Sequence, residues 1–290
     1  MNDYLLSLIL GIIEGLTEFL PVSSTAHLRI SEALLGVNLE DGYWKMFSIV
    51  IQLGAVLCLP IYFASRIGGF ISTFPQGRRG DKTMLTHPIS LTLIAFVCTA
   101  GPAFVLKKVI GKNLENLPLM GAALIVGGII MWAVDAVFDG RKALAGQGAA
   151  DELEHMTIGQ AVWIGCCQIL SAVVPGTSRS MITIAAGQSA GLTRSAALEF
   201  SFLLSLPTMA AATCYDLLKF LKPSHGEPVP HIDSHGWVLL AVGFVISFFV
   251  AWAVVAWFMN WVRTRGFVPF AIYRFIAGAA VLAWTLGMFR

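Results

Sequence analysis

Long apolar stretches dominate the chain and are separated by short polar segments. Six of them carry at most one charged residue and approach or reach about 20 residues, the length a helix needs to cross a bilayer. They cover residues 46–65, 88–106, 117–134, 200–215, 237–260 and 267–289. None alternates apolar and polar residues as the strands of a membrane barrel do, so we expect an all-α integral membrane protein with about six transmembrane helices.

Two further apolar segments end in a break. Residues 4–13 lead into two acids and then Pro21, and residues 156–178 contain Pro175 followed by glycine and hydroxyl residues. Proline interrupts a helix, and non-helical backbone at membrane depth is tolerated only inside the protein or beside a wet cavity. We therefore predict two re-entrant helix–loop–helix hairpins whose breaks lie inside the protein. The predicted hairpins cover residues 1–40 and 156–193.

The two broken segments align with each other at an offset of 154 residues. Identical residues stand at four aligned pairs of positions: Gly11 and Gly165, Leu16 and Leu170, Pro21 and Pro175, and Ser24 and Ser178. Three predicted spans lie between the breaks, and an odd number inverts the second copy in the membrane. We expect an inverted-topology repeat, with halves 1–139 and 156–290 joined by a linker at 140–155, and a functional site where the hairpins meet.

The composition excludes a water-soluble globular protein. Of the 290 residues, 57% are hydrophobic and only 12% are charged, and the mean hydropathy is +0.76, whereas soluble domains are about 25% charged. A net charge of +2 offers no basic field, so we expect membrane lipid as a partner and no nucleic acid. The basic residues are almost evenly divided between the two sides, and their small bias places the 66–87 loop in the cytoplasm.

The first break carries two acids at membrane depth. Glu14 and Glu18 are four residues apart and share a helix face, and each carboxylate costs about 2.5–3.5 kcal/mol there. Their tolerance requires a cation, a proton or water, and carboxylate oxygens suit Mg²⁺ or Ca²⁺. If a helix starts near Ser24, the Ser24 hydroxyl and the His27 imidazole can lie close to each other. Ser24 could attack phosphorus while His27 takes its proton, or Glu18 or a metal could activate a water; the sequence leaves both routes open.

The second break favours an anion. Gly176 frees the backbone, Ser178 or Ser180 can cap the helix that follows, and the free N–H groups at the start of a helix attract negative charge. Arg179 adds a planar fork that matches phosphate oxygens, and Thr183 lies one turn later on the same face. The second break is therefore a candidate phosphate site. Arg274 in the last span is expected to snorkel or to pair with an acid.

Both breaks resemble the signature motifs of a known family. Residues 14–27 read EGLTEFLPVSSTAH and residues 175–183 read PGTSRSMIT. They are similar to the two motifs of the bacterial undecaprenyl-diphosphate phosphatases, also called bacitracin-resistance proteins, and the length and span pattern match over nearly the whole chain. Ala26 and Met181 stand where the family often has glycine, and neither change removes a reactive group.

The resemblance implies hydrolysis of undecaprenyl diphosphate to the monophosphate carrier lipid, which is reused in cell-wall synthesis. It implies that Glu14 and Glu18 hold Mg²⁺ or Ca²⁺ or activate the nucleophile, and that Ser24 and His27 are nucleophile and base. The implied ligands of the polyprenyl diphosphate are Ser178, Arg179 and Thr183. The implied location is the bacterial inner membrane, as a multi-pass protein with its site facing the periplasm. The sequence leaves a homodimer open.

Two other functions are compatible with the same pattern. An inverted-repeat transporter or lipid flippase would use the acids for coupling ions and Arg179 for an anionic substrate, but it would not need Ser24 and His27. A purely structural membrane protein would not need its buried acids at all.

Overall fold

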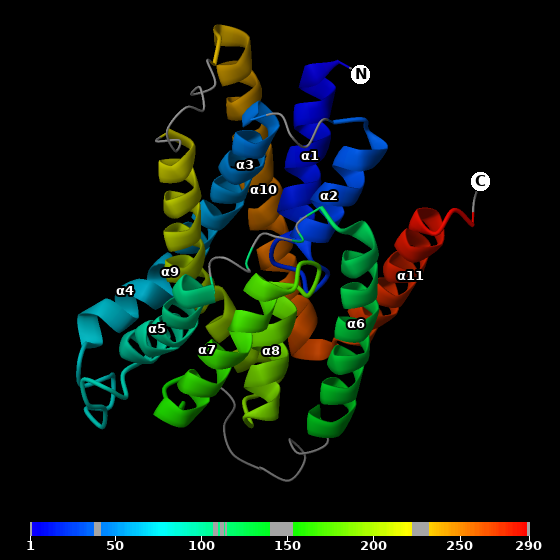
Figure 1. Ribbon diagram of the computed structural model, residues 1–290. Coiled ribbons are helices and arrows are strands. Elements are labelled where there is room, and N and C mark those ends of the chain that lie inside the picture. Colours follow the sequence, from blue (N-terminus) through cyan, green and yellow to red (C-terminus); the bar gives the residue numbers. More distant parts are fainter. Residues whose placement is uncertain are drawn as a thin grey trace.

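The computed structural model describes residues 2–37, 42–106, 110, 113, 115–139, 153–221 and 232–288. Over these residues the chain forms eleven helices and no strand, which confirms the all-α prediction (Figure 1). The helices are α1 (Asp3–Thr17), α2 (Ser24–Leu34), α3 (Gly42–Tyr62), α4 (Ala64–Thr73), α5 (Pro88–Val105), α6 (Leu117–Asp139), α7 (Ile158–Val173), α8 (Arg179–Ser189), α9 (Arg194–Leu221), α10 (Ser234–Thr264) and α11 (Val268–Thr285). Most of the predicted linker 140–155 lies outside the described residues.

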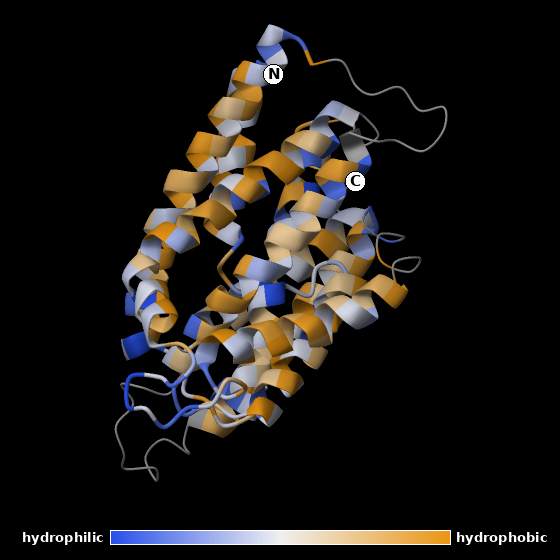
Figure 2. Ribbon diagram, turned by 90° about the vertical axis from the view of Figure 1, so that its left-hand side faces the viewer, coloured by the Kyte–Doolittle hydropathy of each residue, from blue (hydrophilic) through white to orange (hydrophobic). Residues whose placement is uncertain are grey.

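Six of these helices are long and apolar enough to cross a membrane, as predicted from the apolar stretches. They are α3, α5, α6, α9, α10 and α11. Many of their large apolar side chains face outward, including Val97, which is 64% exposed, and Phe249, which is 57% exposed. Figure 2 shows hydrophobic colour along the lengths of the helices and hydrophilic colour gathered in loops at one end. Such an outer surface fits lipid contact rather than water.

Helix α4 was not predicted, because its residues fell within the segment interpreted as the start of a polar loop. It follows α3 after a single intervening residue, and Phe70 is its buried anchor. The Arg66 guanidinium lies 4.8 Å from the centre of the Phe70 ring, and its Nε donates to Glu199 of α9 at 2.7 Å. A short helix held by one aromatic residue and one ion pair gives little periodic signal in the sequence.

The two segments in which hairpins were predicted contain the helix pairs α1–α2 and α7–α8, in which each helix packs against its partner. None of the four exceeds 16 residues, and each is shorter than the roughly 20 residues needed to cross a bilayer. Figure 1 shows both breaks near the middle of the molecule, where α1–α2 comes down from the N-terminal end and α7–α8 comes up from the opposite end. The breaks also touch, because the Ser180 hydroxyl donates to the Leu20 carbonyl oxygen at 2.9 Å.

The second helix of each pair begins in the same way. Ser23 and Ser178 are the two non-glycine residues with positive φ in the described chain, at 75° and 73°. Their side chains cap α2 and α8 by accepting from the N–H groups of Ala26 and Met181. The structure therefore pairs Ser178 with Ser23, whereas the sequence alignment paired it with Ser24. The shift arises because one more residue separates the proline from the cap in the second break.

Candidate active site

The end of α1 carries the two acids of the first break. Glu14 is 1% exposed and Glu18 is 6% exposed, and the Glu18 N–H donates to the Glu14 carbonyl oxygen at 2.9 Å. This bond continues the helical spacing by one residue, so both side chains lie on one face as predicted. The Oε1 atom of Glu14 is buried and has no hydrogen-bond partner. A buried acceptor without a donor is costly, which marks Glu14 as a place where a proton, water or cation is needed.

Glu18 joins the two breaks. Its Oε2 accepts a hydrogen bond from the Ser24 hydroxyl at 2.5 Å, and its Oε1 accepts one from Nη2 of Arg179 at 3.3 Å. Ser24 is the first residue of α2 and Arg179 is the first residue of α8, so each helix start directs one side chain toward the same carboxylate. The structure thus brings three of the predicted site residues into direct contact, from segments far apart in the sequence.

His27 lies elsewhere. Its Nδ1 is 2.7 Å from the Ser23 carbonyl oxygen, and its Nε2 is 2.6 Å from the hydroxyl of Tyr273 on α11, whose ring stacks on the imidazole. A carbonyl oxygen only accepts, so Nδ1 carries a proton and neither nitrogen is free. The predicted closeness of Ser24 and His27 is not realised as a hydrogen bond, because the Ser24 hydroxyl donates to Glu18 and α11 holds the imidazole. No motif marks Tyr273, which lies in a helix long and apolar enough to span a membrane.

The three predicted anion-binding residues of the second break occupy different places. Arg179 reaches Glu18, and its Nη1 donates to the Ser201 carbonyl oxygen on α9 at 3.4 Å. Ser178 caps α8 and lies 3.0 Å from the hydroxyl of Ser180. Thr183 is buried, and its hydroxyl lies 2.6 Å from that of Ser201, so it fastens α8 to α9. Ser201 was missed in the sequence because it belongs to no motif.

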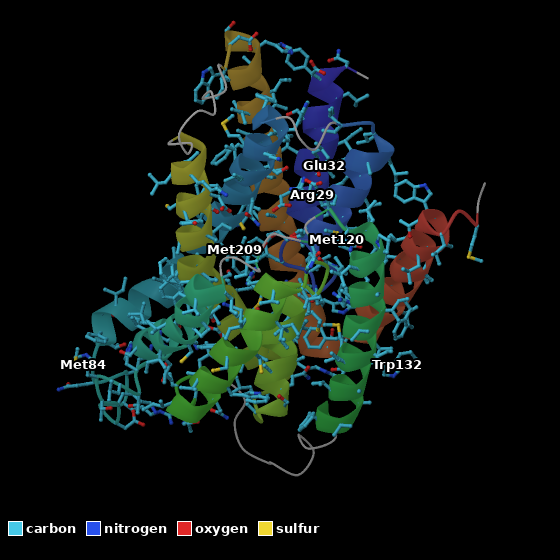
Figure 3. The ribbon with its side chains drawn as sticks, viewed as in Figure 1. Arg29, Glu32, Met84, Met120, Trp132 and Met209 are labelled. Atoms are coloured by element: carbon cyan, nitrogen blue, oxygen red, sulfur yellow. The ribbon has the colours of Figure 1, made fainter. Side chains whose placement is uncertain are left out.

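A cavity of about 180 Å³ opens between the breaks. It is lined by Glu18, Ser23, Ser24, Thr25, Gln52, Ser171, Ala172, Pro175, Gly176, Ser178, Arg179, Thr208, Met209 and Ala212. Four predicted site residues are among them: Glu18, Ser24, Ser178 and Arg179. The other three, Glu14, His27 and Thr183, stand outside this lining. In Figure 3 the label of Met209 lies between α9 and the centre of the molecule, beside the breaks.

Arg274 of α11 does not line the cavity, but it forms hydrogen bonds to the two breaks that do. It is 0% exposed, and its guanidinium donates to carbonyl oxygens of both breaks and of α6. The acceptors are Pro21 at 3.0 Å, Gly176 at 3.3 Å, Thr177 at 3.1 Å, Ala123 at 3.0 Å and Leu124 at 3.1 Å. The expectation that Arg274 snorkels or pairs with an acid is therefore wrong. A guanidinium has five N–H donors, and here three carbonyls of the breaks and two carbonyls of α6 accept hydrogen bonds from it.

The donor set fits a divalent cation only in part. In the portion of the chain that is described, no three His, Cys, Asp or Glu side chains come together as a metal site. Both oxygens of Glu18 already accept hydrogen bonds. The Oε1 atom of Glu14 has no partner, so it is the carboxylate oxygen most available to a cation. Carboxylate oxygens suit Mg²⁺ and Ca²⁺. Two acids and one arginine leave the site with a formal charge of −1, so an incoming anion needs a further cation or proton.

Known proteins resemble the chain over its whole length. It is 64% identical over 290 residues to a protein named undecaprenyl-diphosphatase from Koribacter versatilis, covering 99% of each chain. Proteins of the same name from Sorangium cellulosum and Novosphingobium aromaticivorans are 42% and 37% identical, with 95% and 98% of this chain covered, and 84% and 98% of theirs. The family model described as bacitracin resistance protein BacA matches residues 7–280. With this match over most of its residues, the chain belongs to the BacA family of bacitracin resistance proteins.

Proposed function

We propose that the protein hydrolyses undecaprenyl diphosphate to undecaprenyl phosphate and inorganic phosphate, and so returns the carrier lipid to cell-wall synthesis. The observation that carries this proposal is Glu18, which binds both Ser24 and Arg179 at a cavity between the breaks. A nucleophilic hydroxyl, a carboxylate that can take its proton and a guanidinium that can bind phosphate are the parts that phosphoryl transfer requires. The relatives named undecaprenyl-diphosphatase support the same reaction, and the family description supports a role in bacitracin resistance.

In the mechanism that we favour, Ser24 is the nucleophile and Glu18 is the base. The Ser24 oxygen bonds to the terminal phosphorus as the bond from that phosphorus to the bridging oxygen breaks, and the lipid monophosphate leaves. Glu18 takes the Ser24 proton across the 2.5 Å hydrogen bond. Water then attacks the phosphorus, the bond from phosphorus to the Ser24 oxygen breaks, Glu18 returns its proton to that oxygen, and both protons of the water leave with the phosphate. Arg179 stabilises the charge on the phosphoryl oxygens. The alternative, in which Glu18 activates a water directly, uses the same carboxylate.

His27 could serve as the base only if its ring left Ser23 and Tyr273. In the hydrogen-bonded arrangement observed here, it instead links the first break to α11. Ser178 and Thr183 contribute to diphosphate binding by fixing the start of α8, from which Arg179 projects.

A divalent cation would be held by Glu14 and Glu18 and would supply positive charge against the diphosphate. Purified protein in detergent should therefore release phosphate from undecaprenyl diphosphate, lose that activity when EDTA is added, and regain it with Mg²⁺ or Ca²⁺. Activity that is unchanged by the chelator would remove the metal from the proposal. Release of no phosphate, together with transfer of labelled lipid between the leaflets of proteoliposomes, would favour the transporter or flippase instead.

We also propose that both helix pairs are re-entrant hairpins of an inverted repeat in the bacterial inner membrane, with the cavity open to the periplasm. The four short helices and the three spanning helices between the pairs support this arrangement. It places the loop after α4 in the cytoplasm and the start of α1 outside. In a chain without native cysteines, Tyr4→Cys should react with an impermeant maleimide on intact spheroplasts, and Met84→Cys should react only after lysis. The reverse pattern would invert the topology.

A further inference from the structure

The cavity has two chemically different sides. One side comes from the two breaks and carries Glu18, Ser24, Ser178 and Arg179. The other side comes from the end of α7 and the middle of α9, and its apolar members are Ala172, Met209 and Ala212; α3 adds the uncharged amide of Gln52 to the lining. The charged groups that line the cavity, Glu18 and Arg179, therefore both belong to the break side. A ligand with an anionic head and an apolar tail matches this division.

Two hydroxyl residues on the helix side do not change its character. The Ser171 hydroxyl donates to the Gln168 carbonyl oxygen at 2.7 Å, and the Thr208 hydroxyl donates to the Leu204 carbonyl oxygen at 2.7 Å. Each hydroxyl has one proton, which is used within its own helix. This side therefore offers no free hydroxyl proton to a phosphate, and an anionic head gains more by binding against Arg179.

The apolar residues run from the interior to the surface. Met209 is buried, Ala172 is partly buried and Ala212 is exposed, and Ala212 lies within the spanning helix α9. The cavity itself, at about 180 Å³, is smaller than the roughly 300–1,000 Å³ of pockets that enclose drug-sized ligands. It can hold a small polar head, but a long isoprenoid chain has to leave it, and the apolar residues mark a route on which the chain buries no polar group.

We propose that Ala172, Met209 and Ala212 form a lip over which the isoprenoid segment next to the diphosphate passes from the cavity to the surrounding lipid. The lip makes the enzyme selective for diphosphates attached to an apolar chain. It orients the substrate with its terminal phosphate toward Ser24 and Arg179. This inference rests on the proposed function, and it adds the residues that recognise the tail.

The test compares a substrate with a tail and one without. Ala212→Trp places a large ring on the lip, and it should be tolerated because Ala212 is exposed. We expect kcat/KM for undecaprenyl diphosphate to fall at least tenfold, while kcat/KM for methyl diphosphate in the same detergent changes by less than twofold. The matched control is Ala211→Trp, since Ala211 is also exposed on α9 but does not line the cavity. It should leave both values unchanged.

A second variant changes the polarity of the lip rather than the size of one of its side chains. Met209→Ser shortens the side chain and makes it polar, and it should raise KM for the lipid substrate severalfold without affecting methyl diphosphate. If Ala212→Trp lowers both activities equally or neither of them, the lip does not recognise the tail and this inference is wrong, whatever the status of the phosphatase. If the unmodified protein releases phosphate from neither substrate, the proposed function fails and the inference fails with it.

Discussion

Glu18→Gln should lower kcat/KM for undecaprenyl diphosphate by about 10³-fold, the scale of losing one group that stabilises a transition state. The amide keeps the shape of the side chain, but it cannot take the Ser24 proton and no longer offers a negative charge to Arg179. Phosphate release from detergent-solubilised protein measures the loss. Near-normal turnover by the folded variant would show that another group takes the Ser24 proton, and it would contradict the assignment of Glu18 as the base.

The chain provides a matched control for this substitution. Glu32 on α2 is also buried, and it also binds one arginine and one serine: Arg29 Nη1 at 2.9 Å and the Ser48 hydroxyl at 2.9 Å. It does not line the cavity. Figure 3 labels Arg29 and Glu32 above the breaks, toward the N-terminal end. Glu32→Gln should reduce the stability of the protein as much as Glu18→Gln does, but it should leave kcat/KM within about threefold.

Arg274→Met should lower the free energy of unfolding by at least about 3 kcal/mol, because the buried carbonyl oxygens of Pro21, Gly176 and Thr177 in the breaks lose their guanidinium donor. For a chain of this size that loss corresponds to a fall of roughly 5–10 °C in the unfolding midpoint. Activity should fall as well, since Arg274 holds Pro21, Gly176 and Thr177 in both breaks. Thermal unfolding in detergent and phosphate release measure the two effects.

The size of the arginine matters as well as its charge. Gly127 of α6 leaves the room that the guanidinium occupies, since a Cβ there would collide with Nη2 of Arg274. Arg274→Lys keeps the charge, but it has three donors on one atom and cannot reach acceptors on three segments, so it should be nearly as harmful. Arg263→Met, at the exposed end of α10, should leave the midpoint unchanged. A stable and active Arg274→Met protein would contradict the view that Arg274 acts as a clamp, that is, that its guanidinium holds the two breaks together.

Hydropathy predicted the six spanning helices because each is a long apolar run, and proline with hydroxyl residues predicted the two breaks. Within the first break, the spacing placed Glu14 and Glu18 on one face, and the repeat of the two breaks predicted that Arg179 lies at the same site. Four of the residues that the sequence did not predict lie on spanning helices: Gln52, Ser201, Thr208 and Tyr273. A run of apolar residues fixes where a helix lies in the chain, but not which of its sides faces the protein interior.

The hydrogen-bond partners of the site residues were harder to predict than the helices on which these residues lie. A separation of three residues allowed Ser24 and His27 to meet, yet the packing of α11 gave His27 a different partner. The acceptors of Arg274 are backbone carbonyls, and three of them, on Pro21, Gly176 and Thr177, are available because the breaks interrupt helical hydrogen bonding. No residue type in the sequence marks a carbonyl as free, so the role of Arg274 could not be read before the breaks were placed together.

The position of Arg274 in the last helix also bears on when the protein becomes competent during its synthesis. Every group assigned to the reaction has been translated by residue 183, yet the clamp on both breaks arrives only with α11, at residues 268–285. A nascent or truncated chain would therefore carry the complete set of reactive side chains without a formed centre. Loss of the C-terminal helix should therefore be as disabling as loss of the proposed nucleophile, Ser24.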